Sequence, residues 1–213
     1  YVMAHGYTSY DAFMNALEID PTGQLEKRLL GMLTTNHTFF MREFEHMEFL
    51  SRVVLPELSK KESRTKDLGI WCAAASSGEE PYMLAMLIKD YFGLDHVNWD
   101  TTILATDIST EILEQATRGV YTAEQIASVP AQWKRRYFKE CPDHEHYQVT
   151  DDIKKEILFR RFNLMSPFLF KRKFHVVFLR NVMIYFDNKT KQDLIRKVYQ
   201  SMEPGGYLFI GRT

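Results

Sequence analysis

Features that define several large protein classes are missing from this sequence. Only two of its 213 residues are cysteines, Cys72 and Cys141, which fits a reduced, cytoplasmic setting. No run approaches the roughly 18 consecutive apolar residues that a membrane-spanning helix needs, so no membrane insertion is expected. The formal net charge is only −1, which predicts no general attraction to nucleic acid or to anionic lipid.

Glycine is missing where a dinucleotide-binding turn would need it. Ala73, Ala75 and Gly78 occupy the three glycine positions of a G-x-G-x-x-G turn, between an apolar run at 68–74 and a helical pattern at 79–92. In dinucleotide enzymes the second glycine lets the backbone approach a pyrophosphate closely. Alanine there argues against NAD and FAD. A nucleoside ligand without a pyrophosphate still fits, and S-adenosylmethionine is the leading candidate.

Two polar features near this turn have alternative explanations that the local sequence leaves open. Ser77 and Glu80 also match a capping box, in which a serine and a glutamate three residues later satisfy free amides at a helix start. Asp107 ends the next predicted strand, where a carboxylate can accept hydrogen bonds from ribose hydroxyls. The alternative is that Asp107 caps the helix that follows, but two markers at a suitable separation, Glu80 and Asp107, favour the ribose interpretation.

The rest of the chain alternates between strand and helix patterns. Five apolar runs read as strands and three intervening segments as helices, which predicts an α/β fold with a doubly wound, Rossmann-like sheet. The strands are expected at 68–74, 101–106, 157–162, 174–179 and 207–211, and the helices at 79–92, 110–118 and 190–202.

Two segments fall outside this alternation. Residues 1–45 read as short helices and are expected to form a helical domain ahead of the main domain at 46–213. A further helix is expected at 44–58, with Pro56 limiting or kinking its end. Residues 120–156 are too long for a plain loop, so we expect an inserted subdomain there, with short helices at 122–128 and 131–138.

The insertion also contains Cys141, His144 and His146, which raises the question of a zinc site. Their spacing matches no standard metal pattern and no second ligand pair is evident, so a surface turn is the better interpretation and no metal is expected. Because the chain begins at Tyr1 and stops just after an apolar run, we expect it to be a fragment of a longer protein.

Polar residues follow the buried strand at 174–179. Arg180, Asn181 and Tyr185 come directly after it, and residues at the carboxyl edge of a parallel strand lie over the ligand crevice of such folds. Arg42, after two phenylalanines, is a further candidate cation. The alternative for Arg42 is a helix-surface residue that pairs with Glu45.

Five motifs in order make a specific resemblance. The motifs are TTNHTFFMR at 34–42, ASSGEEPY at 75–82, ATDI at 105–108, RFNL at 161–164 and LRNVMIYFD at 179–187. Together they resemble the chemoreceptor glutamate methyltransferases of bacterial chemotaxis, over most of the chain. The sequence departs from the family pattern at His37, Met41 and Arg212, where Leu, Phe and His are usual.

The resemblance implies a fold, a reaction and a set of site residues. It implies an N-terminal helical domain, a binding domain for S-adenosylmethionine and a small inserted β-subdomain. The reaction would methylate glutamates of the cytoplasmic domain of chemoreceptors and leave S-adenosylhomocysteine. The residues implied to contact the cofactor are Asn36, Thr38, Arg42, Glu79 or Glu80, Asp107, Asn163, Leu164, Arg180 and Asn181, and those associated with catalysis are Arg42 and Tyr185.

Two other functions compete with this reading. One is a different methyltransferase that acts on a small molecule, another protein or nucleic acid, although the net charge argues against nucleic acid. The other is a non-catalytic module that binds the cofactor or a receptor. Loss of the residue types at Arg42 and Tyr185 would favour that module, and both are present.

Overall fold

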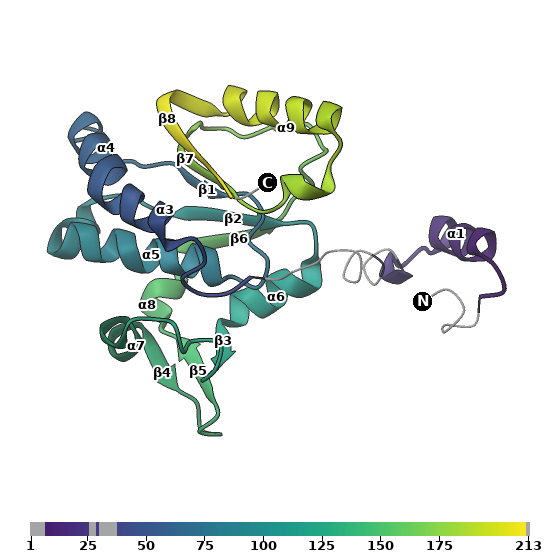
Figure 1. Ribbon diagram of the computed structural model, residues 1–213, viewed down its shortest axis with the longest axis horizontal. Helices are drawn as coiled ribbons and strands as arrows, with labels where there is room; N and C mark the ends of the chain where they lie inside the picture. The colour runs from purple at the N-terminus through teal and green to yellow at the C-terminus, as the bar shows by residue number, and fades with distance from the viewer. Residues whose placement is uncertain (1–6, 26–28, 30–37, 212–213) are drawn as a thin grey trace.

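A five-stranded parallel sheet forms the centre of the molecule (Figure 1). The computed structural model describes residues 7–25, 29 and 38–211. The strand order is β6-β2-β1-β7-β8, and all neighbours are parallel. The bounds are Ile157–Arg161 for β6, Ile103–Asp107 for β2, Ile70–Cys72 for β1, Phe174–Leu179 for β7 and Met202–Ile210 for β8. The predicted five strands are confirmed, and β8 lies at one edge.

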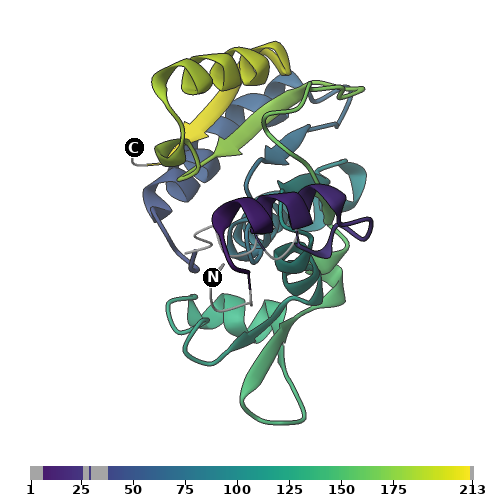
Figure 2. The ribbon, with the colours of Figure 1, turned by 90° about the vertical axis from the view of Figure 1, so that its right-hand side faces the viewer.

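Helices cover both faces of the sheet, as the doubly wound prediction requires (Figures 1 and 2). Ile70 and Cys72 pack on one face with residues of α3, α4 and α5, whereas Trp71 packs on the other face with residues of α9. This alternation follows from the two-residue period of a strand. The bounds are Phe44–Phe49 for α3, Leu55–Lys61 for α4, Glu79–Phe92 for α5, Thr110–Arg118 for α6 and Asn188–Gln200 for α9.

The helix predicted at 44–58 continues past Pro56 to Lys61. Between α3 and α4 the chain forms a π-helical segment, Leu50–Val54, where the amide of Leu55 donates to the carbonyl of Leu50 five residues back. Proline near the start of a helical segment loses no hydrogen bond, because the first amides have no partner within that segment. The irregularity therefore lies before Pro56, and the proline does not end the helix.

The insertion forms a second, antiparallel sheet, which confirms the predicted inserted β-subdomain. Its strand order is β3-β5-β4, and the helices α7 and α8 accompany it. Their bounds are Val120–Thr122 for β3, Ala131–Tyr137 for α7, Phe138–Glu140 for β4, His146–Val149 for β5 and Asp151–Lys154 for α8. The helix predicted at 122–128 is wrong, because Thr122 pairs with His146 in the sheet and 123–128 form successive turns.

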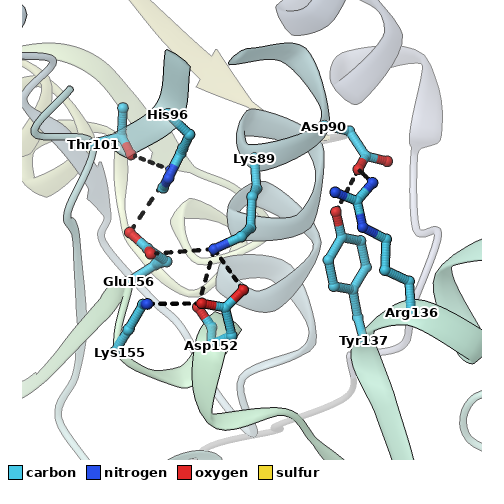
Figure 3. A network of polar contacts seen from close by, with 9 residues as sticks. All are labelled: Lys89, Asp90, His96, Thr101, Arg136, Tyr137, Asp152, Lys155 and Glu156. Carbon is cyan, nitrogen blue, oxygen red and sulfur yellow. Dashed lines mark hydrogen bonds and ion pairs between the residues drawn. The ribbon is translucent and has the colours of Figure 1, made fainter. Parts of the chain in front are cut away.

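Polar contacts fasten the insertion to α5 (Figure 3). The carboxylate of Asp90 accepts hydrogen bonds from Trp133 at 2.7 Å, from Arg136 at 2.6 Å and from the hydroxyl of Tyr137. On the neighbouring residue of α5, the Lys89 ammonium lies 2.7 Å from Asp152. The insertion is therefore held against the main domain at both α7 and α8.

The N-terminal part of the described chain contains α1, Tyr10–Ile19, which lies apart from the sheet in Figure 1. The Ser9 hydroxyl caps it by accepting from the amide of Ala12 at 3.1 Å. Part of the predicted helical domain at 1–45 lies outside the described residues, and the division into domains at 45 remains a prediction. Among the described helices, none has the length and apolar character needed to cross a membrane.

The buried His96 predicts how stability depends on pH. Its Nε2 lies 3.0 Å from the Thr101 hydroxyl and 3.8 Å from Glu156 (Figure 3). Burial lowers the pKa of His96, and the charge of Glu156 only partly opposes this. Below about pH 6.5 His96 therefore takes up a proton in the unfolded chain and resists protonation in the folded chain. Its contribution to the free energy of unfolding is full above that pH and is lost as the pH falls.

Replacing this histidine should flatten that dependence. We expect the free energy of unfolding in urea to fall between about pH 7.5 and pH 5.5, and His96→Gln to make the fall shallower by at most about 1.4 kcal/mol per pH unit. His144→Gln, at an exposed turn, is the matched control. Equal slopes for the wild type and His96→Gln would contradict the assignment.

Candidate active site

A cavity of about 390 Å³ lies at the carboxyl edge of the sheet. That is the position at which open α/β sheets bind ligands, and the volume is within the usual range for small-molecule sites. Its walls come from the turns after β1, β2, β6 and β7 and from the segment before α3. The lining residues are Thr38, Phe39, Arg42, Ala73, Ala74, Ser76, Glu80, Met83, Asp107, Ile108, Phe162, Asn163, Leu164, Met165, Arg180, Asn181, Val182, Ile184, Tyr185 and Phe186.

The structure brings most of the predicted site residues together on this one cavity. These are Thr38, Arg42, Glu80, Asp107, Asn163, Leu164, Arg180, Asn181 and Tyr185. Asn36 lies outside the described residues. Glu79 is described and does not line the cavity. Residues separated by more than 140 positions in the chain therefore share one site.

The turn between β1 and α5 is not a capping box. Helix α5 starts after Gly78, whose φ is 97°, and no side chain caps it. The Ser77 hydroxyl instead donates to Glu79 at 2.6 Å. A Cβ at position 78 would lie only 3.0 Å from the Tyr121 hydroxyl. Both the left-handed backbone and the close approach therefore require glycine there.

Asp107 joins two turns at the cavity wall and does not cap α6. Its carboxylate accepts from the amide of Ser76 at 2.9 Å and from the amide of Ser109 at 3.1 Å. The cap of α6 is Ser109, whose hydroxyl accepts from the amide of Ile112. Burial raises the pKa of Asp107, and the backbone donors oppose that rise. The aspartate is thus a buried acceptor at the cavity.

The two adjacent glutamates of α5 have different surroundings. Glu79 is 2 % exposed, lies away from the cavity, and burial raises the pKa of its carboxyl group. Glu80 lines the cavity, lies 2.5 Å from Arg180 and accepts from the Cys72 thiol at 3.0 Å. Burial also raises the pKa of that thiol. Of the two glutamates, Glu80 is therefore the one positioned at the cavity, and its contact with the cofactor stays a prediction.

Arg180 is the centre of a buried charge network. Its side chain is only 3 % exposed and lies 3.4 Å from Glu43 as well as beside Glu80. Its guanidinium also donates to the backbone carbonyl of Arg42 at 2.6 Å, and the Asn181 amide donates to Glu43 at 3.2 Å. The sequence analysis did not identify Glu43 as a site residue, because nothing in its local pattern distinguishes it from an ordinary glutamate at the start of a helix.

Backbone strain is concentrated around this cavity. Six described residues other than glycine have a positive φ, and four of them lie at or beside the site: Met41, Glu43, Ser76 and Asn181. Such conformations are unfavourable for residues with a Cβ and cluster at functional sites, where the surroundings impose them.

The residues present fit S-adenosylmethionine. The carboxylates of Asp107 and Glu80 are suited to ribose hydroxyls and to an ammonium group, and apolar side chains such as Ile108 and Leu164 can enclose a base. The Arg180 guanidinium, which also lines the cavity, is a cation suited to a ligand carboxylate. Among the described residues, no cluster of histidine, cysteine and carboxylate side chains could hold a metal ion.

Comparison with known proteins identifies the family. Residues 36–213 match the family model described as CheR methyltransferase, SAM binding domain. The chain belongs to the CheR methyltransferase family. It is 39% identical over 212 residues to a chemotaxis protein methyltransferase of Borreliella burgdorferi, which covers 98% of this chain and 74% of the relative. It is 33% identical over 211 residues to that of Escherichia coli, which covers 98% and 71%.

Solved structures show a more distant likeness. A glycopeptide N-methyltransferase, MtfA, complexed with S-adenosylmethionine is 15% identical, with a TM-score of 0.40 over 89% of this chain and 59% of that one. The family membership confirms the predicted resemblance, and the chain is an S-adenosylmethionine-dependent methyltransferase.

The buried position of Asp107 predicts its contribution to binding. Asp107→Ala should weaken the binding of S-adenosylhomocysteine by about 1–3 kcal/mol, because a ligand hydroxyl would lose a charged acceptor in a buried site. Isothermal titration calorimetry measures this, with Asp143→Ala at an exposed turn as the control. An unchanged affinity in the folded variant would remove Asp107 from the binding site.

Proposed function

We propose that this methyltransferase acts in the cytoplasm on glutamate side chains of the cytoplasmic domain of chemoreceptors and forms methyl esters. The names of its relatives as chemotaxis protein methyltransferases support this substrate. One observation of this structure carries the proposal: Arg42 and Tyr185, which can bind a carboxylate, line the same cavity as Glu80 and Asp107.

The cofactor side of the cavity is proposed to use residues from every turn at the sheet edge. Asp107 accepts from the ribose hydroxyls, Glu80 and Arg180 hold the charged amino-acid end, and Asn163 and Leu164 contact the base. Thr38, Asn181 and Asn36 complete the proposed contacts. When bound, S-adenosylmethionine supplies a methyl group on a positively charged sulfur.

The acceptor side is proposed to use Arg42 and Tyr185. A glutamate with a pKa of about 4.3 is ionised at neutral pH, so its oxygen attacks without a strong general base. The Arg42 guanidinium orients that carboxylate by charge-assisted hydrogen bonds, and the Tyr185 hydroxyl donates a further one. What remains for the protein is to align the reacting atoms and to exclude water.

The outer rim of the cavity favours a macromolecular acceptor. Tyr185 is 55 % exposed, and its neighbours on the rim, Ile184 and Phe39, are each 49 % exposed. Apolar side chains around a cavity mouth are typical of protein interaction sites. The Arg42 guanidinium lies over the ring of Phe39, 5.7 Å from its centre, so the cation belongs to this rim.

The chemical stability of the product tests the proposed function. The protein is incubated with a methyl-labelled donor and receptor membranes, and the labelled receptor is then treated with mild base. Methyl esters release labelled methanol, whereas N-methyl products do not. Receptor with its methylated glutamates replaced by alanine is the control. Label that stays on the protein after base treatment would contradict ester formation.

A change at Tyr185 should affect turnover but not cofactor binding. Tyr185→Phe removes only the hydroxyl, so we expect turnover to fall roughly 10- to 100-fold while the affinity for S-adenosylhomocysteine stays within about twofold. Tyr199→Phe on α9, where the side chain is 77 % exposed, is the matched control. A collapse of cofactor affinity would make Tyr185 a binding or packing residue instead.

A further inference from the structure

The segment that carries Arg42 is anchored in the inserted subdomain. Phe40, two residues earlier, is completely buried. Its ring packs edge-on against Tyr121 of β3, with 4.9 Å between centroids, and against Phe138 of β4 at 5.8 Å. The hydroxyl of Ser128 donates to the carbonyl of Phe40 at 3.0 Å. These three contacts all join Phe40 to the insertion at 120–156.

The backbone between this anchor and α3 is strained around Arg42. Met41 and Glu43, on either side of it, have φ values of 68° and 47°. Left-handed conformations at two such residues persist only where surrounding contacts over-determine them. Phe40 fixes one end of the turn, and Asn181 and Arg180 hold Glu43 at the other end.

The insertion is itself a fixed support. Asp90 on α5 binds its helix α7 through a contact with Trp133 and through contacts with Arg136 and Tyr137, which Figure 3 shows. The Tyr121 hydroxyl, from β3, donates to the carbonyl of Ser77 at 2.7 Å. The insertion therefore contacts both the turn at the start of α5 and the segment that delivers Arg42.

From these contacts we infer that the inserted subdomain is a working part of the acceptor side, with Phe40 and Ser128 as positioning residues that set where the Arg42 guanidinium lies. The inference rests on the acceptor role proposed for Arg42. It gives the insertion a function in transfer itself, independent of any partner that it binds. Changes at this anchor should affect methyl transfer more than cofactor binding.

Two small changes test the hydrogen bond. Ser128→Ala removes the donor to the Phe40 carbonyl and should lower kcat on receptor about 3- to 10-fold, the factor expected for one hydrogen bond, while the affinity for S-adenosylhomocysteine stays within about twofold. Ser128→Thr retains the hydroxyl and should keep kcat near the wild-type value. Equal kcat for the serine and alanine forms would overturn the inference.

A matched pair of core substitutions tests the aromatic anchor. Phe40→Leu should lower kcat more than about tenfold with cofactor affinity retained, because the ring contacts that set the turn are lost. Phe174→Leu makes the same chemical change in another buried ring, at the amino end of β7, and should lower the melting temperature without this loss of kcat. If the two variants lose kcat in proportion to their stability, Phe40 is only a core residue and the inference is wrong.

A double-mutant cycle asks whether the anchor acts through Arg42. In an Arg42→Ala background, Ser128→Ala should change the residual kcat by a factor of about one, whereas independent effects would multiply. If Arg42→Ala abolishes transfer, the cycle cannot be measured. The inference is then tested by whether Ser128→Ala lowers kcat while it keeps the affinity for S-adenosylhomocysteine. A wild-type chain that methylates no receptor would overturn the proposed function, whereas active wild type with an unaffected Ser128→Ala overturns only the inference.

Discussion

The architecture of the site depends on one buried cation. The Arg180 guanidinium is 3 % exposed and lies between the carboxylates of Glu80 and Glu43. Removing a charge from water costs several kcal/mol, so a buried cation is stable only where its partners are fixed in place. Those partners come from the start of α5 and from the segment before α3, which also contributes the carbonyl of Arg42. A single side chain therefore holds three distant segments at the edge of the sheet.

The same geometry is suited to both a cationic cofactor and an anionic acceptor. Glu80 and Asp107 form acidic wall positions, whereas Arg42 belongs to the exposed rim. Carboxylates inside suit the positively charged cofactor, and a cation at the mouth suits a carboxylate that arrives from another protein. This arrangement of charges supports the proposed division of the cavity into a cofactor side and an acceptor side.

Features with a strong local signal could be predicted from the sequence, whereas those made by tertiary contacts could not. The bounds of α5 and β7 were predicted to the residue, because continuous apolar runs and helical spacing define them. Of the two alternatives for the turn at Ser77, the capping box is excluded, because α5 starts after a left-handed Gly78 and no side chain caps it. Glu79 and Glu80 are adjacent residues of one helical turn. They differ only in the direction of their side chains, which the sequence does not show. Glu43 gained its role through Arg180, 137 positions further along the chain, and no local pattern reports that contact.

The most direct test of this account is the affinity of Glu43→Gln for S-adenosylhomocysteine, measured by titration calorimetry beside Glu45→Gln. Glu43 does not line the cavity, so it can affect the ligand only through the residues that it holds, whereas Glu45 is exposed. The account predicts that Glu43→Gln weakens binding by about 1–3 kcal/mol, the usual cost of losing a charged partner in a buried network, and that Glu45→Gln leaves it unchanged. Wild-type affinity in a folded Glu43→Gln variant would contradict the claim that the Arg180 network organises the site.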